Sequence, residues 1–87
     1  MPQYFFHIRD HDVLLVDDLG LELSSLEDAV VEARRGISGM LADAALEGDD
    51  VLGQVMEITD SAGAVLLGIP FRDVANAADE AVARAQH

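Results

Sequence analysis

The sequence predicts one α+β domain, in which a four-stranded antiparallel sheet carries a main helix on one face and a short helix follows at the C-terminus. Three observations support this fold class. The 87 residues are too few for two hydrophobic cores, yet 51% of them are hydrophobic, which is more than disordered chains contain. Short runs alternate apolar and polar residues, as strands do. One long segment repeats apolar residues at helical spacing, which gives the order ββαββα.

The first two strands are expected at residues 3–9 and 13–16. The first run alternates between two faces and contains three of the four aromatic residues, so we expect this strand in the middle of the sheet. A polar break at residues 10–12 separates the two runs, which therefore predict a hairpin. An acidic turn at residues 17–20 follows, and Leu21 and Leu23 then continue an extended chain to the start of the helix.

The main helix is expected at residues 25–47. The sequence Ser24-Ser25-Leu26-Glu27 is typical of a capping box in which Glu27 reaches back to the N-cap, and Gly48 ends the helix. An apolar stripe follows the cap and consists of Leu26, Val30, Ala33, Ile37, Met40, Leu41 and Ala44. Gly36 and Gly39 lie together on one flank of this stripe, and each costs about 1 kcal/mol relative to alanine. They indicate either a tolerated weakness or the close approach of another element.

The second pair of strands is expected at residues 54–59 and 64–69, around the turn at residues 60–63, and Pro70 closes the last strand. From Asp73 onward a thin apolar face recurs at helical spacing and consists of Val74, Ala77, Ala78, Ala81, Val82 and Ala85. Because this face buries little, the helix is expected to dock on this domain, dock on a partner or fray. We place the domain at residues 1–74 and a C-terminal helix or tail at residues 75–87.

The alternation predicts which side chains meet in the core. Tyr4, Phe6 and Ile8 are expected to pack under Val30, Ile37 and Leu41, although the alternation also permits the opposite face of this strand. The other face of the sheet is then expected to carry Phe5, with Met56 or Ile58, and to need cover.

The charge balance limits the partners of the chain. Seventeen Asp and Glu residues stand against five arginines and no lysine, for a formal net charge of −12. Such a surface repels nucleic acid and anionic membranes, and it attracts a basic protein or a metal cation. Solubility alone is the simpler explanation of the acidity. No apolar run is long enough to span a bilayer and no signal-like segment begins the chain, so a cytoplasmic location is expected.

One group of residues around the first hairpin has the chemistry of metal ligands and consists of His7, Asp10, His11, Asp12, Asp17 and Asp18. The calcium-loop pattern fails, because Leu14 stands where a third ligand belongs, so we interpret the group as turn and surface residues. The hydroxyl side chains that could act as nucleophiles are Ser24, Ser25, Ser38, Thr59 and Ser61. The histidines that could act as their bases are His7, His11 and His87. None lies in a recognisable catalytic motif. No catalytic residue, metal or cofactor is predicted.

The opening residues 2–10 read PQYFFHIRD. They resemble an uncharacterised family of short bacterial proteins, a domain of unknown function, whose members open with P-x-Y-[FY]-F-H-[IV]-R-[DN]-G. The turns at residues 17–20 and 60–63 and the run at residues 67–71 are similar too, so the resemblance covers residues 2–74. It implies a ββαββ unit and no particular activity. His11 replaces the usual glycine, which predicts a different turn.

The sequence favours a non-enzymatic protein-interaction module, either homodimeric or bound to another protein. An alternative is an antitoxin-like regulatory module that binds a small basic partner, which rests on element order and charge alone. A third hypothesis, less favoured, is a metal-dependent or hydrolytic enzyme that uses His7, Asp10, His11 and Asp12. A homodimer would have to overcome like-charge repulsion, so its self-association should strengthen as salt is added.

Overall fold

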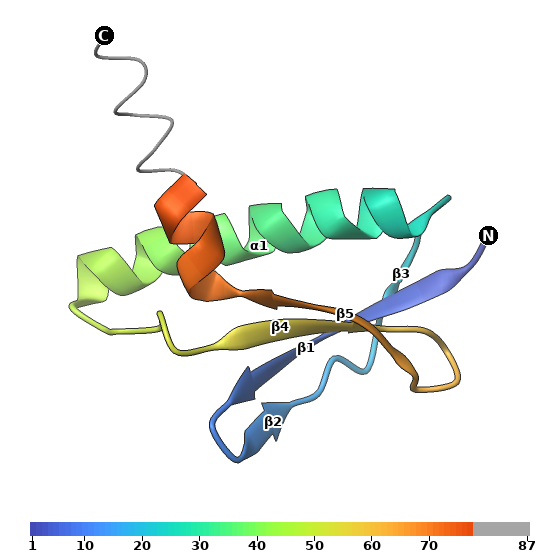
Figure 1. Cartoon of the computed structure of the whole chain (residues 1–87), viewed down its shortest axis with the longest axis horizontal. Helices are drawn as coiled ribbons and strands as arrows, with labels where there is room; N and C mark the ends of the chain where they lie inside the picture. The colour runs from blue at the N-terminus through green and yellow to red at the C-terminus, as the bar shows by residue number, and fades with distance from the viewer. Residues whose placement is uncertain (78–87) are drawn as a thin grey trace, which may run out of the picture.

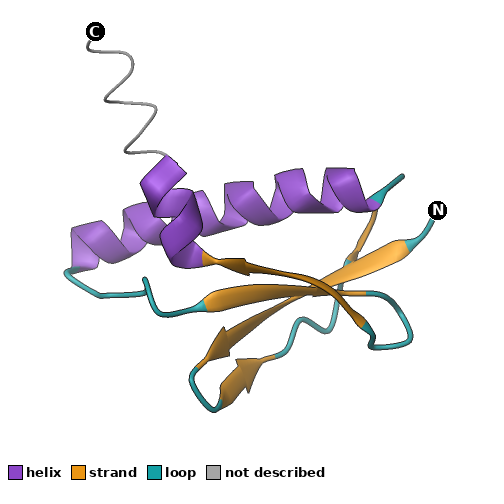
Figure 2. Ribbon diagram, in the orientation of Figure 1, coloured by secondary structure: helices purple, strands orange, loops and turns teal. Residues whose placement is uncertain are grey.

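The computed structural model describes residues 1–77 of the chain (Figure 1). Its elements are β1 (Gln3–Asp10), β2 (Val13–Leu15), β3 (Leu21–Glu22), α1 (Leu26–Glu47), β4 (Val55–Thr59) and β5 (Val65–Pro70), and residues 71–77 are helical as well. All strand pairs are antiparallel, in the order β2-β1-β4-β5, with β3 also paired to β1. The helices lie on one side of the sheet (Figure 2). The predicted fold class and element order are confirmed.

The β1 strand is the centre of this sheet, as its aromatic content predicts. One edge of β1 pairs with β4, in a register that places Phe6 opposite Ile58 and Ile8 opposite Met56. The other edge is shared by two short strands, because β2 pairs with the end of β1 near Asp10 and β3 pairs with the end near Gln3. The chain between β2 and β3 leaves this edge and returns to it.

The turn between β1 and β2 contains His11. His11 has a φ of 54°, which lies in the left-handed region that glycine adopts most easily. Asp10 and Val13 pair directly across this two-residue turn. The histidine therefore adopts a backbone conformation that is more typical of glycine, and the difference from the turn of the resembling family stays a prediction.

The α1 helix begins where the serines predict, but its cap is built differently from the predicted one. Ser25 is the N-cap, and its hydroxyl accepts a hydrogen bond from the backbone N–H of Asp28 at 3.2 Å. With Ser25 at the cap, the third helical residue is Asp28 rather than Glu27, and the Asp28 carboxylate accepts a hydrogen bond from the Ser24 hydroxyl. The predicted role of Glu27 is therefore wrong by one residue. Gly48 ends the helix as expected.

The core lies between α1 and the middle of the sheet, and its buried members are Tyr4, Ala29, Ala33, Ile37, Met56, Ile58, Ile69, Phe71 and Val74. Phe6, Ile8, Val30 and Leu41 pack against this core but are only partly buried, so the predicted facing of β1 toward the helix is confirmed. Met56 and Ile58 are 5% and 0% exposed on the same face. The expectation that one of them lies on the opposite face is therefore wrong, because each pairs with a core-facing residue of β1.

The helical residues 71–77 dock on the same core. Phe71 is completely buried and Val74 is 6% exposed, so this segment packs within the chain. The remainder of the predicted C-terminal face, from Ala78 to Ala85, lies outside the described residues. Within residues 1–77, no helix has both the length and the hydropathy to cross a membrane.

The main helix covers only part of the sheet. It packs chiefly on β4, and the β1–β2 hairpin points away from it (Figure 1). Every residue of β2 is exposed even though all three are apolar. This off-centre position of α1 creates the candidate site.

Candidate functional site

An apolar surface lies on the helix side of the sheet, beyond the area that α1 covers. We call it the open shelf, and it consists of Phe6, Ile8, Val13, Leu15 and Leu21. Leu15 pairs with Ile8 and Leu21 pairs with Tyr4, so these leucines share a face with the core-facing side chains of β1. Val13, Leu15 and Leu21 are 58%, 55% and 47% exposed. A contiguous apolar face of this kind is typical of an interaction surface.

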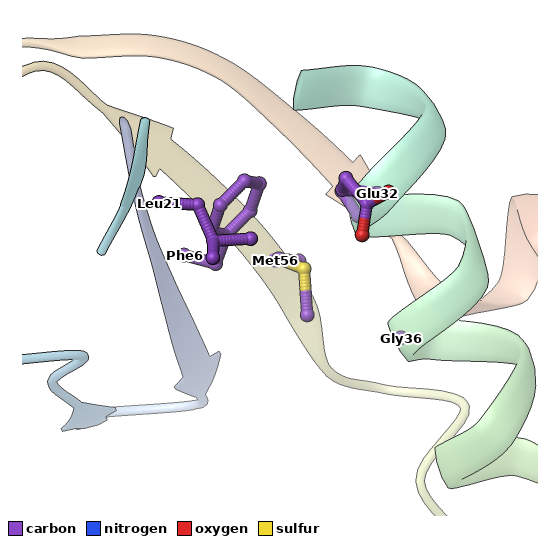
Figure 3. Close-up of a pocket in the computed structure, with 6 residues that line it drawn as sticks. Phe6, Leu21, Glu32, Gly36 and Met56 are labelled. Atoms are coloured by element: carbon purple, nitrogen blue, oxygen red, sulfur yellow. The ribbon is translucent and has the colours of Figure 1, made fainter. Parts of the chain in front are cut away.

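A cavity of about 140 Å³ separates the open shelf from α1. Its lining comes from two sides, with Phe6, Leu21 and Met56 on the strands and Glu32, Ala33 and Gly36 on the helix (Figure 3). Cavities of this size and lining accept small apolar groups such as a benzene ring. The cavity can therefore hold one large apolar side chain.

Gly36 lines this cavity, and Gly39 follows it by about one turn of α1. A Cβ at Gly36 would meet only the Met56 methyl carbon, at 4.0 Å, and a Cβ at Gly39 would meet nothing within 4 Å. No element within residues 1–77 therefore requires either glycine for close packing. The sequence offers two explanations of these glycines, a tolerated weakness of the helix or the close approach of another element. If another element does approach them, it must come from outside residues 1–77.

Two carboxylates lie beside the open shelf. Asp10 pairs with Val13 at one end, and Glu32 lines the cavity. Glu22 pairs with Gln3, so it lies on the opposite face of the sheet from Leu21. Arg35 donates a hydrogen bond to Glu32 at 3.2 Å, but this pair lies at the surface and contributes little. The edge of the shelf is therefore acidic.

The opposite face of the sheet is more polar at its centre. Arg9 donates a hydrogen bond to the Glu57 carboxylate at 2.9 Å, and this bond raises the pKa of the Arg9 guanidinium. The Phe5 ring is stacked with the His7 ring, with 6.4 Å between their centroids, and also lies against Gly20. The loop before β3 thus covers part of Phe5, and this face has less need of a partner than the sequence indicates.

The predicted group of histidines and aspartates does not converge. Within residues 1–77 no three His, Asp or Glu side chains form a metal-ligand arrangement. Asp10 accepts a hydrogen bond from the Gln54 amide at 3.3 Å, and His11 lies 3.8 Å from Asp10 at the surface. Asp12 and Asp18 are exposed. These residues act in turns and at the surface of the hairpin.

Among the candidate hydroxyls and histidines, the structure brings together Thr59 and His7. The His7 Nδ1 accepts a hydrogen bond from the backbone N–H of Asp17 at 3.0 Å, which assigns the ring proton to Nε2. Nε2 lies 3.2 Å from the Thr59 hydroxyl oxygen and donates to it. Thr59 is only 3% exposed, and the cavity is on the other side of the sheet. The pair joins β1 to β4.

Asp17 takes the place of a missing strand neighbour at the β1 edge. Its carboxylate accepts hydrogen bonds from the backbone N–H groups of Phe6, Leu19 and Gly20 at 3.1, 3.0 and 3.2 Å. Burial raises the pKa of this carboxyl, but the three backbone hydrogen bonds and the nearby His7 together lower it below the usual value of 3.8. Asp17 is thus a structural carboxylate, which its position in a turn alone does not reveal.

A comparison with family models identifies the chain. The model of a domain of unknown function, DUF6894, matches residues 3–72. The chain belongs to this family. An uncharacterised family of this kind is what the resemblance of the opening residues implies. No curated protein and no solved structure matches the chain.

The candidate site lies within the part of the chain that the DUF6894 model matches, since every residue of the open shelf and of the cavity lies between residues 3 and 72. The surface offers apolar contact, one cavity for an anchoring side chain and acidic edges. Among residues 1–77, Glu32 is the only ionisable residue that lines the cavity, and the other lining residues are apolar or glycine.

Proposed function

We propose that this DUF6894 chain is a non-enzymatic protein-interaction module that binds another polypeptide through the open shelf. The observation that carries the proposal is the half-covered sheet, on which Val13, Leu15 and Leu21 are about half exposed beside an apolar cavity. A homodimer is one form of this function, and a complex with a different protein is the other.

Burial supports the proposal. A chain of this size buries only about 60–65% of its unfolded surface, so it gains stability when a partner covers more apolar area. The apolar residues of β2 remain exposed at an edge of the sheet. Unpaired apolar edges are sites where a second chain adds to a sheet or packs against it.

Site-specific photo-crosslinking in the native host tests this function. A photo-reactive amino acid replaces Leu15 on the shelf, and in a matched control it replaces Leu46, which is 88% exposed at the end of α1. We expect an adduct of discrete mass from position 15 and none from position 46. A 9.3 kDa chain with no adduct at position 15, or with the same adducts at both positions, would contradict the proposal.

Sedimentation equilibrium then separates the two forms of the function. A homodimer should tighten as salt screens the repulsion between two chains of net charge −12. A monomer at every salt concentration, together with an adduct to a different protein at position 15, would assign the shelf to a foreign partner.

A further inference from the structure

We propose that the partner of the open shelf is an amphipathic helix with basic flanks, supplied by another protein. This inference rests on the proposed function and specifies its ligand. The shelf and the cavity determine the shape of the partner, and the carboxylates around them determine its charge.

The uncovered part of the helix side of the sheet lies beside α1, which packs chiefly on β4. Two packed helices lie about 8–10 Å apart, so a neighbour parallel to α1 would lie over β1 and β2. Val13 and Leu15 are exposed there, next to the partly buried Ile8. Gly36 and Gly39 have no neighbour within residues 1–77 that fills their Cβ space, so this flank of α1 permits the close approach of a second helix.

A strand is a poorer partner for this edge. The β2 strand has only three residues, so an added strand would gain few backbone hydrogen bonds. A strand added at the edge would also leave the helix side of Leu15 and Leu21 uncovered. A helix that lies on the shelf covers both of these side chains and fills the cavity.

The charge argues against a second copy and for a basic partner. Asp10 and Glu32 lie beside the shelf, and the whole chain has a net charge of −12. A second copy would place further carboxylates near these groups, which costs energy. Lysine or arginine residues beside the apolar face of a bound helix would instead approach them favourably. One large apolar residue in the cavity would anchor the helix.

The test measures binding of three labelled synthetic peptides to the full chain by fluorescence anisotropy. Each has about 18 residues, which gives a helix of about 27 Å. The first has leucines at i, i+3, i+4 and i+7 with lysines between them, the second has glutamates in place of the lysines, and the third scrambles the first. We expect the first to bind at least about tenfold more tightly than the others, and to weaken as salt is added.

Variants of the chain locate the binding. Leu15→Gln removes apolar contact from the shelf, and Gly36→Leu places a side chain in the cavity while it removes a glycine from the helix. Each should weaken binding of the first peptide about tenfold, which equals about 1.4 kcal/mol. Leu66→Gln, at an exposed leucine of β5 on the opposite edge of the sheet from β2, should leave binding unchanged. Thermal melts of all three variants show whether they are folded.

Several outcomes would overturn the inference. Equal binding of the scrambled peptide would show attraction by charge alone, and equal binding of the acidic peptide would show no charge selection. Unchanged binding by Leu15→Gln and Gly36→Leu would place the peptide elsewhere. A photo-crosslinker at position 15 that joins a second copy, or residues 78–87 of its own chain, would identify a different occupant. Only the crosslink to a second copy would overturn this inference and still support the proposed function.

Discussion

At the scale of single residues, the edge of β1 depends on Asp17 and Gly20. Asp17 binds three backbone N–H groups at the outer edge of β1, where neither β2 nor β3 pairs with Phe6. Gly20 has a φ of 67° and lies directly against the Phe5 ring. These two residues let the chain leave the β1 edge after β2 and return to it as β3.

Replacement of Asp17 by alanine should destabilise the fold by about 2 kcal/mol, because three donors lose a charged acceptor. Urea unfolding monitored by circular dichroism measures this loss. Asp18→Ala is the matched control, since Asp18 is an exposed neighbour in the same turn. Equal losses for the two variants would show that the hydrogen bonds of Asp17 contribute nothing specific.

The effect of Asp17 should depend on pH. Its pKa is lower in the folded chain than the usual 3.8. The ionised carboxylate therefore stabilises the fold above the unfolded pKa, and this contribution disappears as the pH falls through the folded pKa. The difference in unfolding free energy between the wild type and Asp17→Ala should be full at about pH 7 and smaller at about pH 3. A difference that grows on acidification would contradict this assignment.

Two glycines with positive φ separate backbone strain from steric clash. A Cβ at Gly20 would lie 2.8 Å from the Phe5 ring and 2.9 Å from the Tyr4 carbonyl oxygen, whereas a Cβ at Gly63 would meet nothing within 4 Å. Gly63→Ala should cost about 1 kcal/mol through backbone conformation alone. Gly20→Ala should cost more, by at least about 1 kcal/mol. Chemical denaturation of both variants measures the difference, and equal costs would show that the loop moves freely away from β1.

At the scale of elements, α1 is well capped but weakened in its interior. Ser25 satisfies an N-terminal amide, and Glu27 and Asp28 lie in the first turn, where they interact favourably with the helix dipole. The interior glycines oppose this gain. No atom of residues 1–77 lies within 4 Å of a Cβ built at Gly39. No packing contact within these residues therefore offsets the low helix propensity of Gly39.

Gly39→Ala should stabilise the isolated chain by about 1 kcal/mol, because alanine has the higher helix propensity and its Cβ meets no neighbour. The melting temperature should rise by about 4–8 °C. Gly36→Ala should give a similar gain, since its Cβ makes only an ordinary contact with Met56. A loss of stability in either variant would mean that residues 78–87 or a second chain already pack on this flank.

At the scale of the whole molecule, the core is displaced toward β4 and the helical residues 71–77. Phe71, Ile37 and Ile58 are the largest completely buried side chains. Phe6 is only partly buried, because it lies at the boundary between the core and the open shelf. We therefore expect Phe71 to contribute more to stability than Phe6.

Phe71→Ala should cost about 3–5 kcal/mol, a large part of the stability of so small a domain. Phe6→Ala should cost less, about 1–3 kcal/mol, because much of its ring already faces the cavity. The sequence alone places Phe6 in the core under the helix, and a fully buried phenylalanine there would have the larger cost. Urea denaturation of both variants decides the order, and a greater loss for Phe6→Ala would show that the shelf is covered in solution.

The sequence by itself determined the local features of this protein. Strand alternation in β1, the helical stripe of α1 and the serine cap are patterns within short segments, and each predicted its element correctly because the period of the side chains follows from the backbone. The net charge likewise needs no structure, and it disfavours nucleic acid as a partner.

Only the tertiary structure decided how these elements share the sheet. The periodicity of α1 does not predict that this helix packs on β4. The sequence of residues 13–16 does not predict that their side chains are exposed. The facing of Met56 and Ile58 depends on their register with β1, and the role of Asp17 depends on a gap between β2 and β3. Such contacts join residues far apart in the chain, so they follow from packing rather than from any local pattern.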